Sequence, residues 1–582
     1  MKRILILLSI VLVLFSCTEN NVTNIVGYDR TLVIITDFSL ESDIMIGIEG
    51  AVRQQHPDVD IKLIKNQAFD VFESGVLLES AAQSFPENTY FAVIVDPGTA
   101  ALKFVYEAAG RRVLVPDNGA STKMRKLFSA TSMHYIDDPS LFGDEFNDIP
   151  SIPYDKFWRD AILNLLSDKP LSVFGSVCET PQEINIINPK VENNSVIGQV
   201  QLTDNFGNCE TNISLDFMTG FTNGDILEIS TSERRFFAKY GTHYASVEAA
   251  ENVAFPNSKD RLEIAVNLMN MSERYNIKAG DQISVKKATI IAGILRYNSS
   301  ELVDNIIAGI KLRMNERGFK EGINISYIEK NANGDIANFP DLIQEMNTAG
   351  TDLLIPVSTP ASQAAVQFVP QDIPIVYTYV TSPEFAGIVN KRLNVTGLSD
   401  ATNFDDYLGF VNELLPEIKN AGRIYNPNEP NSAYSQGRFL ELGPFYGITY
   451  HNQEVFEQSE IESAFNSIIN TEADAILIAA DNTMNLGFKG LAELSSGSKI
   501  PLIGDSYENA SDGALASISV DYDLLASSTG NTVSNVILGV KADDIPIQRF
   551  PTSVITLNQK TADKIEFTFP QSILNKAKHI IE

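Results

Sequence analysis

Residues 288–317 read ATIIAGILRYNSSELVDNIIAGIKLRMNER, a short apolar run followed by a polar turn and a long amphipathic stretch. The run 290–295 is typical of a fully buried strand. In the stretch 303–317, the apolar residues with the spacing of one helical face are Ile306, Ile307, Ile310 and Met314. A buried strand followed directly by an amphipathic helix is the repeating unit of a mostly parallel α/β sheet.

The same alternation continues through the rest of the chain. Further strand-like runs follow at 353–357, 375–380, 422–425, 475–479 and 500–504, and earlier ones lie at 32–35, 91–95 and 112–115, with a helical stretch at 44–52. Ligands of open α/β sheets bind at the carboxyl ends of strands, so the loops after these runs are where a site is expected. Between residues 196 and 285, short strands and turns replace the alternation and predict a small β-rich unit.

Residues 1–17 have the composition of an export leader. A basic start, Lys2-Arg3, precedes an apolar run over residues 4–15 that is too short to remain as a membrane-spanning helix. The run ends in Ser16-Cys17, which resembles the lipobox of bacterial lipoproteins and implies cleavage before Cys17 and acylation of its thiol. The alternative is a plain secretory leader with an incidental cysteine. Residues 18–29 are then a polar tether from the membrane.

Length and charge limit the possible partners. The chain has 582 residues with 74 acidic and 44 basic side chains, a net charge of −30. This length predicts about two to four domains, and the charge disfavours nucleic acid as a partner. Besides Cys17, only Cys178 and Cys209 are present, and they can form one disulfide or remain separate buried thiols. No Cys/His spacing suggests a metal site.

Several strings in the first half stand directly after predicted strands or turns. They are Thr36-Asp37-Phe38, Val95-Asp96-Pro97-Gly98, Pro116-Asp117-Asn118-Gly119, Asp204-Asn205-Phe206-Gly207-Asn208 and Thr211-Asn212-Ile213. In this order and spacing they resemble the S-adenosylmethionine hydrolase (adenosine-forming) family, which is related to the fluorinases and chlorinases. The resemblance implies an α/β domain over 30–190, a small β-barrel over 191–286 and ligand binding between the subunits of a homotrimer.

The resemblance also implies roles for single residues. Asp37 matches the carboxylate that holds the ribose hydroxyls, and a carboxylate can accept from two adjacent hydroxyl donors. The positions that match the lining of the nucleoside pocket are Asn118, Phe206 and Asn208. Asp96 matches the Asp of an Asp-Arg-His set that positions and activates water.

This chain departs from that catalytic set. Lys103 stands where Arg is expected, and in Phe157-Trp158-Arg159-Asp160 a phenylalanine takes the place of His. Loss of a general base removes about 10²–10⁴-fold in rate, and Lys lacks the rigid fork of Arg. A first half that binds a nucleoside, or is only structural, is therefore favoured over an enzyme in which Asp96 and Lys103 activate water alone. Trp158 is expected in the core.

Residues 287–582 carry a different set of strings. They are Ser358-Thr359-Pro360-Ala361, Val380-Thr381-Ser382-Pro383, Asn394-Val395-Thr396-Gly397, Tyr425-Asn426-Pro427-Asn428 and Ala480-Asp481-Asn482-Thr483. Together they resemble the type I periplasmic substrate-binding proteins of ABC transporters, in the branch related to tryptophan and tyrosine uptake. The resemblance implies two α/β lobes, about 288–394 with a C-terminal return and about 395–517, that close on a ligand by hinge motion. It implies an ABC permease as partner and no cofactor.

Candidate ligand contacts follow from the predicted loops. Thr359 and Ser362 begin a predicted helix, where hydroxyls and free N–H groups can take a ligand carboxylate. Thr381 and Ser382 lie in the next loop, although the family often has Asp at position 382 for an ammonium group. The remaining candidates are Tyr297 for stacking on a flat ligand, Asn431 and Ser432 from the other lobe, and the acceptor pair Asp481 and Asn482. For each, the alternative is a helix cap or a satisfied loop group.

These observations predict an envelope-anchored solute receptor. Its second half would capture an amino-acid-like or nucleoside-like molecule for ABC import, and its first half would bind an adenosyl compound without cleaving it. The alternatives are an active adenosyl-cleaving enzyme coupled to a binding domain, and an envelope scaffold in which neither pocket is functional.

Overall fold

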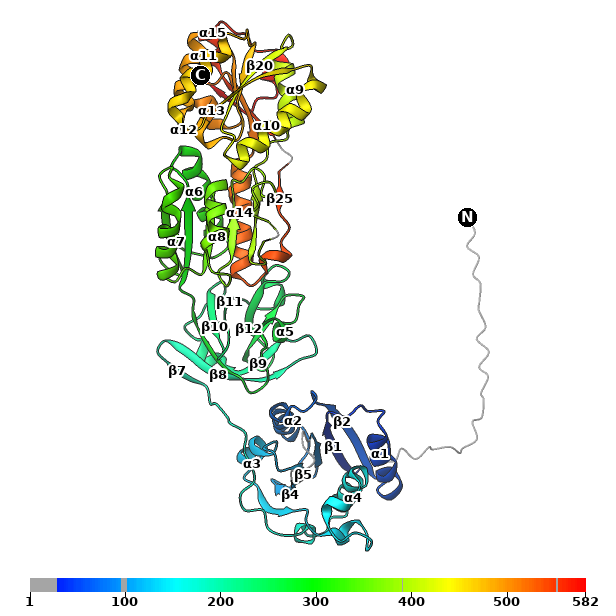
Figure 1. Cartoon of the computed structure of the whole chain (residues 1–582). Coiled ribbons are helices and arrows are strands. Elements are labelled where there is room, and N and C mark those ends of the chain that lie inside the picture. Colours follow the sequence, from blue (N-terminus) through cyan, green and yellow to red (C-terminus); the bar gives the residue numbers. More distant parts are fainter. Residues whose placement is uncertain (1–28, 96–101, 390, 551–552) are drawn as a thin grey trace, which may run out of the picture. The chain divides into compact units, whose positions relative to one another are not determined.

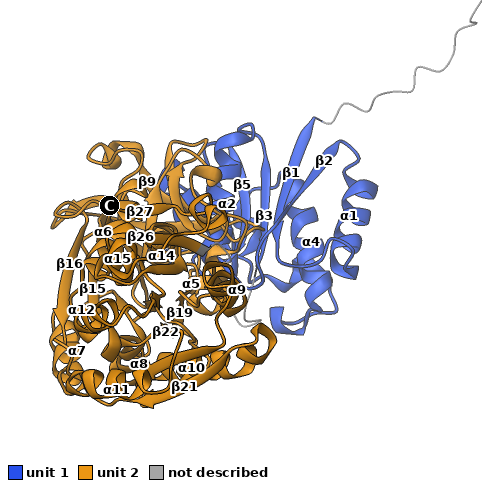
Figure 2. Cartoon of the chain, turned by 90° about the horizontal axis from the view of Figure 1, so that it is seen from above, with its two compact units in different colours: residues 1–186 blue, residues 187–582 orange. Residues whose placement is uncertain are grey.

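The computed structural model describes residues 29–95, 102–389, 391–550 and 553–582 (Figure 1). It divides into two compact units, residues 1–186 and residues 187–582, which Figure 2 shows in different colours. Cys17 and Asp96 lie outside the described residues. Within the described part of the chain, no helix combines the length and the apolar composition that a membrane crossing requires.

Unit 1 is built on one six-stranded sheet with the order β2-β1-β3-β5-β4-β6. Its strands are β1 (Arg30–Thr36), β2 (Val59–Lys65), β3 (Tyr90–Ile94), β4 (Lys103–Ala108), β5 (Arg111–Pro116) and β6 (Thr131–Tyr135). Its helices are α1 (Asp43–Gln55), α2 (Val71–Ser84), α3 (Thr122–Phe128) and α4 (Tyr154–Leu166).

Both faces of this sheet are covered. Leu32 and Ile34 of β1 pack in one apolar cluster with residues of α1 and α4. Val33 and Ile35 pack in a second cluster with residues of α2 and α3. Because successive side chains of a strand point to opposite faces, a strand covered on both faces is apolar throughout. This explains the continuous apolar run at 32–35.

The edge of the unit 1 sheet differs from the parallel arrangement predicted from sequence. β4 pairs antiparallel with β5 and with β6. The β4–β5 connection turns at Ala109 and Gly110, whose φ values are +46° and +73°. Gly adopts this left-handed backbone readily, so Gly110 between two apolar runs was the available sign of a hairpin.

The second unit begins with a small barrel. Its sheet has the order β14-β10-β11-β12-β13-β9-β8-β7, and an additional β14–β8 pairing closes the ring. The strands are β7 (Lys190–Glu192), β8 (Ser195–Thr203), β9 (Cys209–Ser214), β10 (Ile226–Ser230), β11 (Arg235–Tyr240), β12 (Asn252–Pro256), β13 (Arg261–Val266) and β14 (Gln282–Lys287), with the short helix α5 (Met271–Tyr275).

Two further sheets form two lobes. Lobe 1 has the strand order β16-β15-β17-β18-β19-β25, and lobe 2 has β21-β20-β22-β23-β24-β26-β27. The strands of lobe 1 are β15 (Ile290–Arg296), β16 (Ile325–Asn331), β17 (Leu353–Val357), β18 (Ile375–Tyr377), β19 (Val395–Ser399) and β25 (Gln548–Arg549). Those of lobe 2 are β20 (Asn420–Tyr425), β21 (Thr449–Glu454), β22 (Ala475–Leu477), β23 (Leu502–Gly504), β24 (Ala516–Val520), β26 (Ser553–Asn558) and β27 (His579–Ile581).

Helices cover both lobe sheets. Lobe 1 carries α6 (Glu301–Glu316), α7 (Phe339–Thr348), α8 (Thr359–Phe368) and, after the chain returns from lobe 2, α14 (Tyr522–Ile537). Lobe 2 carries α9 (Phe404–Leu414), α10 (Pro430–Leu442), α11 (Ile461–Ile469), α12 (Asn482–Gly497), α13 (Tyr507–Ser511), α15 (Gln559–Ile565) and α16 (Gln571–Leu574). The first crossing between the lobes follows β19, whereas the sequence had placed it before residue 395.

The barrel is packed onto lobe 1. Ile226 and Phe237 of the barrel belong to the same buried apolar cluster as the core residues of β15 and α6. Arg235 pairs with both Glu228 of the barrel and Asp352 of lobe 1. The α/β class, the barrel and the two-lobed second half expected from the sequence are therefore confirmed. Of the two alternatives for the cysteines, the structure has Cys178 and Cys209 as separate buried thiols.

Candidate functional site

Loops from both lobes meet at what we call the interlobe site. Lobe 1 contributes residues 358–362 after β17, 379–383 after β18 and Asp400 after β19; lobe 2 contributes residues 426–432 after β20, 480–483 after β22 and Asp505 after β23. The two sets face each other, since the ring of Phe385, which follows the lobe 1 loop 379–383, lies 6.1 Å from the ring of Tyr434 on α10 of lobe 2. Glu508 of lobe 2 also accepts hydrogen bonds from the side chain of Ser300 and the backbone of Glu301 in lobe 1.

The start of α8 carries a strained and unsatisfied serine. Ser358 has a φ of +98°, a value that a residue with a side chain rarely adopts. Its side chain is 3% exposed, and its Oγ has no hydrogen-bond partner among the described residues. The first N–H groups of a helix also lack intrahelical partners and favour negative charge. This arrangement is suited to a carboxylate.

The neighbouring candidates are Thr359 and Ser362, and both are buried. Thr359 is the first residue of α8, directly after Ser358. The Ser362 Oγ donates to the Ser358 carbonyl oxygen at 2.7 Å, and the Ser362 N–H donates to the same oxygen at 3.0 Å. Ser362 therefore holds the Ser358 peptide in place.

The loop after β18 positions Asp400. The Thr381 side chain hydrogen-bonds the Asp400 carboxyl, and the Thr381 carbonyl accepts from the Ser399 Oγ at 2.8 Å. The Ser382 Oγ accepts from the Phe385 N–H at 3.3 Å, which occupies it in the local turn.

Asp400 and Asp505 are two buried acids that the sequence reasoning did not select. Burial, and then the charge of Asp505, raise the pKa of Asp400 to about 7. Burial raises the pKa of Asp505 to about 6, although its Oδ2 accepts from the Ala480 N–H at 2.6 Å. Each acid directly follows a strand, at the position where ligands of such sheets bind, so the rule used for the other loops could have found them.

In lobe 2, Asp481 and Ser432 are hydrogen-bonded to each other. The Asp481 Oδ2 accepts from the Ser432 Oγ at 2.6 Å and from the Asn426 N–H at 2.7 Å, and its Oδ1 accepts from the Met484 N–H at 2.8 Å. Asp481 is thus the N-cap of α12. Burial, and then the charge of Glu429, raise its pKa to about 7.

Asn482 and Asn431 differ in whether all of their side-chain amide atoms have hydrogen-bond partners. Glu429 accepts from the Asn482 N–H at 2.8 Å and from its Nδ2 at 2.7 Å, so this amide is bound within lobe 2. The Asn431 Nδ2 donates to the Ala480 carbonyl at 2.6 Å, but its buried Oδ1 has no partner among the residues described. Asn431 therefore keeps an acceptor for a donor that is not supplied by the surrounding chain.

Tyr297 lies on the lobe 1 side. Its hydroxyl donates to the Gly334 carbonyl at 2.6 Å, and its ring lies 6.3 Å from that of Phe339. Burial raises the pKa of Tyr297, and the charge of Glu429 from lobe 2 adds to the shift. The side chain is half-buried.

In unit 1, Asp37 and Asn118 follow β1 and β5. The Asp37 Oδ2 accepts from the Phe69 N–H at 2.9 Å, and the Asn118 Nδ2 donates to the Val95 carbonyl at 2.9 Å. Both residues remain partly exposed.

The remaining residues of the supposed catalytic set line an apolar environment. Phe157 stacks on Phe142 with ring centroids 5.0 Å apart, and the Lys103 Nζ lies 5.9 Å from the Phe157 ring. Trp158 is fully buried, as predicted. Where the family has His, this chain therefore has a buried aromatic residue, Phe157.

The barrel presents its two candidates in the β8–β9 turn. The Phe206 side chain is 76% exposed. The Asn208 Nδ2 donates to the Asp204 Oδ2 at 2.8 Å and to the Tyr244 hydroxyl at 3.3 Å. Asn208 is therefore held within the turn, while the Phe206 ring is free to contact another molecule.

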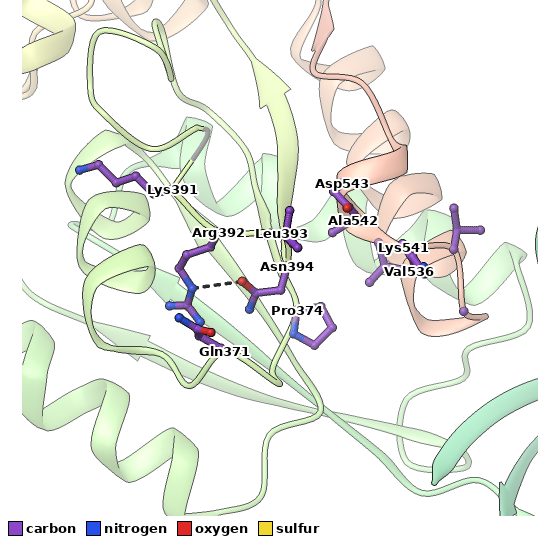
Figure 3. A pocket seen from close by; sticks show the side chains of 12 residues that line it. Gln371, Pro374, Lys391, Arg392, Leu393, Asn394, Val536, Lys541, Ala542 and Asp543 are labelled. Carbon is purple, nitrogen blue, oxygen red and sulfur yellow. Dashed lines mark hydrogen bonds between the residues drawn. The ribbon is translucent and has the colours of Figure 1, made fainter. Parts of the chain in front are cut away.

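A cavity of about 620 Å³ lies elsewhere, at the amino ends of the lobe 1 strands, whereas the interlobe site lies at their carboxyl ends (Figure 3). Its lining includes Pro374 and Asn394, which precede β18 and β19, and the end of α14. The Arg392 guanidinium in its wall donates to Asn394 at 3.1 Å and to the Val369 carbonyl at 2.6 Å. This cavity contains none of the interlobe residues.

In comparisons with known proteins, the two halves of the chain match different protein families. Residues 32–148 match the family model of the SAM hydroxide adenosyltransferase N-terminal domain, and residues 198–284 match that of its C-terminal domain. Residues 292–581 match the model of the ABC transporter substrate binding protein.

Individual relatives resemble the second half. A tyrosine-binding protein of Clostridioides difficile (strain R20291) is 28% identical over 278 residues, which are 47% of this chain and 80% of the relative. A solved ABC domain in complex with L-Trp from Streptococcus pneumonia is 28% identical, with 50% of this chain and 100% of that chain covered and a TM-score of 0.48. A conserved domain protein from Vibrio cholerae is 27% identical over 50% of this chain and 99% of its own, also with a TM-score of 0.48. The chain is therefore a fusion of SAM hydroxide adenosyltransferase N- and C-terminal domains with an ABC transporter substrate-binding protein.

Proposed function

We propose that the second half of this chain is a solute receptor that holds a small amino-acid-like molecule at the interlobe site for an ABC permease. The observation that carries this proposal is the start of α8, where the buried Ser358 hydroxyl lacks a partner among the described residues. A carboxylate placed there would gain a hydroxyl donor and the free N–H groups of the helix. The tyrosine-binding relative supports an amino acid over a nucleoside.

The test is a calorimetric titration of the full chain with L-tyrosine, L-tryptophan, L-leucine and adenosine. Saturable 1:1 binding of at least one amino acid is expected. If adenosine alone binds, the amino-acid assignment is wrong, and if nothing binds, the chain is not a solute receptor of this kind.

Ser358→Ala is expected to weaken amino-acid binding by about 10- to 100-fold, because a hydrogen bond to a charged group contributes about 1.5–3 kcal/mol. The measurement is the dissociation constant by calorimetry. Ser467→Ala is the matched control, since the Ser467 hydroxyl lies exposed on α11 and bonds only its own helix. Equal affinities of the Ser358→Ala and Ser467→Ala chains would show that the ligand carboxylate does not bind at Ser358.

Glu508→Gln is expected to weaken binding by about 2- to 5-fold, because an amide oxygen accepts the hydrogen bonds from Ser300 and the Glu301 backbone more weakly than a carboxylate does, a loss on the order of 0.5–1 kcal/mol. Glu508 contacts Ser300 and Glu301 across the lobes, so its loss should favour the open arrangement. The measurement is the ligand dissociation rate by stopped flow. A rate unchanged from that of the parent chain would show that this contact does not hold the lobes together.

We also propose that Cys17 anchors the protein on the outer side of a membrane through an attached lipid. The leader and the lipobox-like ending support it, and two or more acyl chains give lasting attachment. Cys17→Ser is expected to leave the protein unacylated with an uncleaved leader. Mass spectrometry of the membrane fraction measures both, and an unmodified Cys17 in the parent protein would contradict the anchor.

For the first half, we propose that it binds an adenosyl compound without cleaving it. We also propose that it forms the homotrimer implied by its resemblance to the S-adenosylmethionine hydrolase family, and light scattering of the full chain measures this. The core position of Phe157 supports the absence of a general base. Incubation with S-adenosylmethionine should release no more adenosine than an Asp96→Asn control. Chromatographic detection of adenosine above that control would establish the enzyme instead.

A further inference from the structure

We infer that the barrel and lobe 1 form one rigid body, so that lobe 2 alone moves when a ligand closes the interlobe site. The ligand-driven movement rests on the proposed function, whereas the rigidity of the barrel and lobe 1 is a property of the ligand-free chain. The joint between them belongs to neither matched family, since one match ends at residue 284 and the other begins at residue 292.

The connection between the barrel and lobe 1 is short and buried. β14 ends at Lys287 and β15 begins at Ile290, so two residues join the barrel to lobe 1. The first of them, Ala288, is buried, and its N–H donates to the Ile226 carbonyl of the barrel at 2.9 Å. Flexible boundaries between domains are exposed and are crossed by few contacts. This connection is therefore part of the folded core and does not act as a linker.

A single arginine holds the barrel to two helices of lobe 1. Arg317, the C-cap of α6, donates to the carboxylates of Glu248 and Glu251 in the barrel. Its Nη2 also donates to the Asn535 Oδ1 of α14 at 3.1 Å. The Glu251 side chain is 1% exposed, and a buried carboxylate that loses its cation is left with an uncompensated charge. Separation of the barrel from lobe 1 at this point is therefore strongly opposed.

Two further contacts fix the orientation of the barrel. The buried Asn252 of β12 donates its backbone N–H to the Leu538 carbonyl, just after α14, at 2.8 Å. Arg235 of the barrel pairs with Asp352 of lobe 1, whose Oδ2 also accepts from the Ile291 N–H at 2.9 Å. The contacts thus lie at the ends of α6 and α14 and at the start of β17. Because they are spread over different elements, together they resist rotation about the short connection.

Lobe 1 itself is stiffened by close packing of α6 against α14. Each helix has 16 residues and is about 24 Å long, and Figure 1 shows α14 running through lobe 1. A Cβ added at Gly309 would lie 2.7 Å from the Ala526 Cβ, and one added at Gly530 would lie 2.9 Å from the Ile310 carbonyl oxygen. Packed interiors of this kind do not deform continuously. A movement at the interlobe end is therefore not absorbed within lobe 1.

The contacts between the two lobes are of a weaker kind. The Phe385 side chain of lobe 1 is 59% exposed, and its ring lies 6.1 Å from that of Tyr434 in lobe 2. The chain passes between the lobes after β19 and again before α14, and such ends of elements can absorb the φ and ψ changes of a hinge. Exposed ring contacts separate more readily than buried ion pairs. Closure therefore takes place between the lobes, and the barrel stays with lobe 1.

The test measures distances between spin labels on the full chain by double electron–electron resonance. Labels are placed on three exposed sites, with Ser258→Cys in the barrel, Gln344→Cys on α7 of lobe 1 and Ser467→Cys on α11 of lobe 2. The background is Cys17→Ser, and Cys178 and Cys209 are buried. With saturating L-tyrosine or L-tryptophan, the barrel–lobe 2 distance should change by more than about 2 Å, and the barrel–lobe 1 distance by less than about 1 Å.

A variant of the arginine tests the joint without any ligand. Arg317→Met is expected to broaden the barrel–lobe 1 distance distribution, because the buried Glu251 then lacks its cation. Arg313→Met is the matched control, since Arg313 also lies on α6 but bonds Glu316 and Asn531 within lobe 1. It should leave the distribution as narrow as in the parent. An unchanged distribution in Arg317→Met would show that this arginine does not hold the barrel.

The outcomes separate this inference from the proposed function. In the ligand-free parent, a barrel–lobe 1 distribution as broad as the barrel–lobe 2 distribution would overturn the rigid body, whatever the chain binds. With a bound amino acid, equal changes in both distances would overturn it as well. If no amino acid binds, the proposed function fails, and the ligand-free distributions still decide whether the barrel and lobe 1 are one body.

Discussion

Trp158→Ala is expected to destabilise unit 1 by about 3–5 kcal/mol, the range measured for truncation of a fully buried large aromatic residue. Trp158 on α4 is fully buried, and its ring packs edge-on against Phe157 at 5.7 Å and Tyr154 at 6.2 Å. The truncation leaves a cavity among the other buried residues of the same apolar cluster. For a unit of this size, the calorimetric transition of unit 1 should move down by about 10 °C.

The same substitution tests whether the two units are independent. The interlobe site lies entirely within residues 187–582, so amino-acid affinity should change by less than about 2-fold in Trp158→Ala. Phe206→Ala is a suitable control for aromatic truncation, because the exposed Phe206 ring should affect neither transition. A large loss of amino-acid affinity in Trp158→Ala would contradict the separation of the two functions.

Asp400→Asn is expected to stabilise the ligand-free protein at pH 8, by on the order of 4 kcal/mol. Burial raises the pKa of Asp400 from 3.8 to about 7 in the folded state. The folded state therefore binds more protons than the unfolded state between about pH 4 and pH 7, and the free energy of unfolding falls as the pH rises through this range. Asn does not ionise, so Asp400→Asn removes this loss in the free energy of unfolding.

The pH dependence supplies the control for this prediction. At pH 5 only about a third of that loss has developed, so Asp400→Asn should stabilise the protein clearly less at pH 5 than at pH 8. The measurement is the thermal midpoint of the lobes at pH 5 and pH 8 for both chains. A stabilisation of the same size at both pH values, or none at pH 8, would show that Asp400 is not a strained buried carboxylate.

The sequence predicts the architecture well because the fold depends on apolar periodicity. The runs at 32–35, 290–295 and 353–357 are strands covered on both faces, and such strands are continuous in apolar character. The antiparallel strands β4 and β6 were not predicted, because strand direction depends on partners distant in sequence. An apolar run alone does not encode it.

The candidate site was predicted less completely, because residue type does not reveal how a side chain is satisfied. Ser432 and Asp481 have the chemistry of ligand contacts, but in the structure they bond each other. The importance of Ser358 follows from its backbone conformation and from the missing partner of its hydroxyl, and residue type alone reveals neither. Asp400 and Asp505 become notable only once the structure shows that both are buried.

The most direct measurement of the central claim is a crystal structure of the full chain grown with L-tyrosine or L-tryptophan. The amino acid should lie between the lobes, with its carboxylate within hydrogen-bond distance of the Ser358 Oγ. Density for the amino acid at another place, or lobes closed on each other with the Ser358 Oγ bonded to the protein itself, would contradict the account.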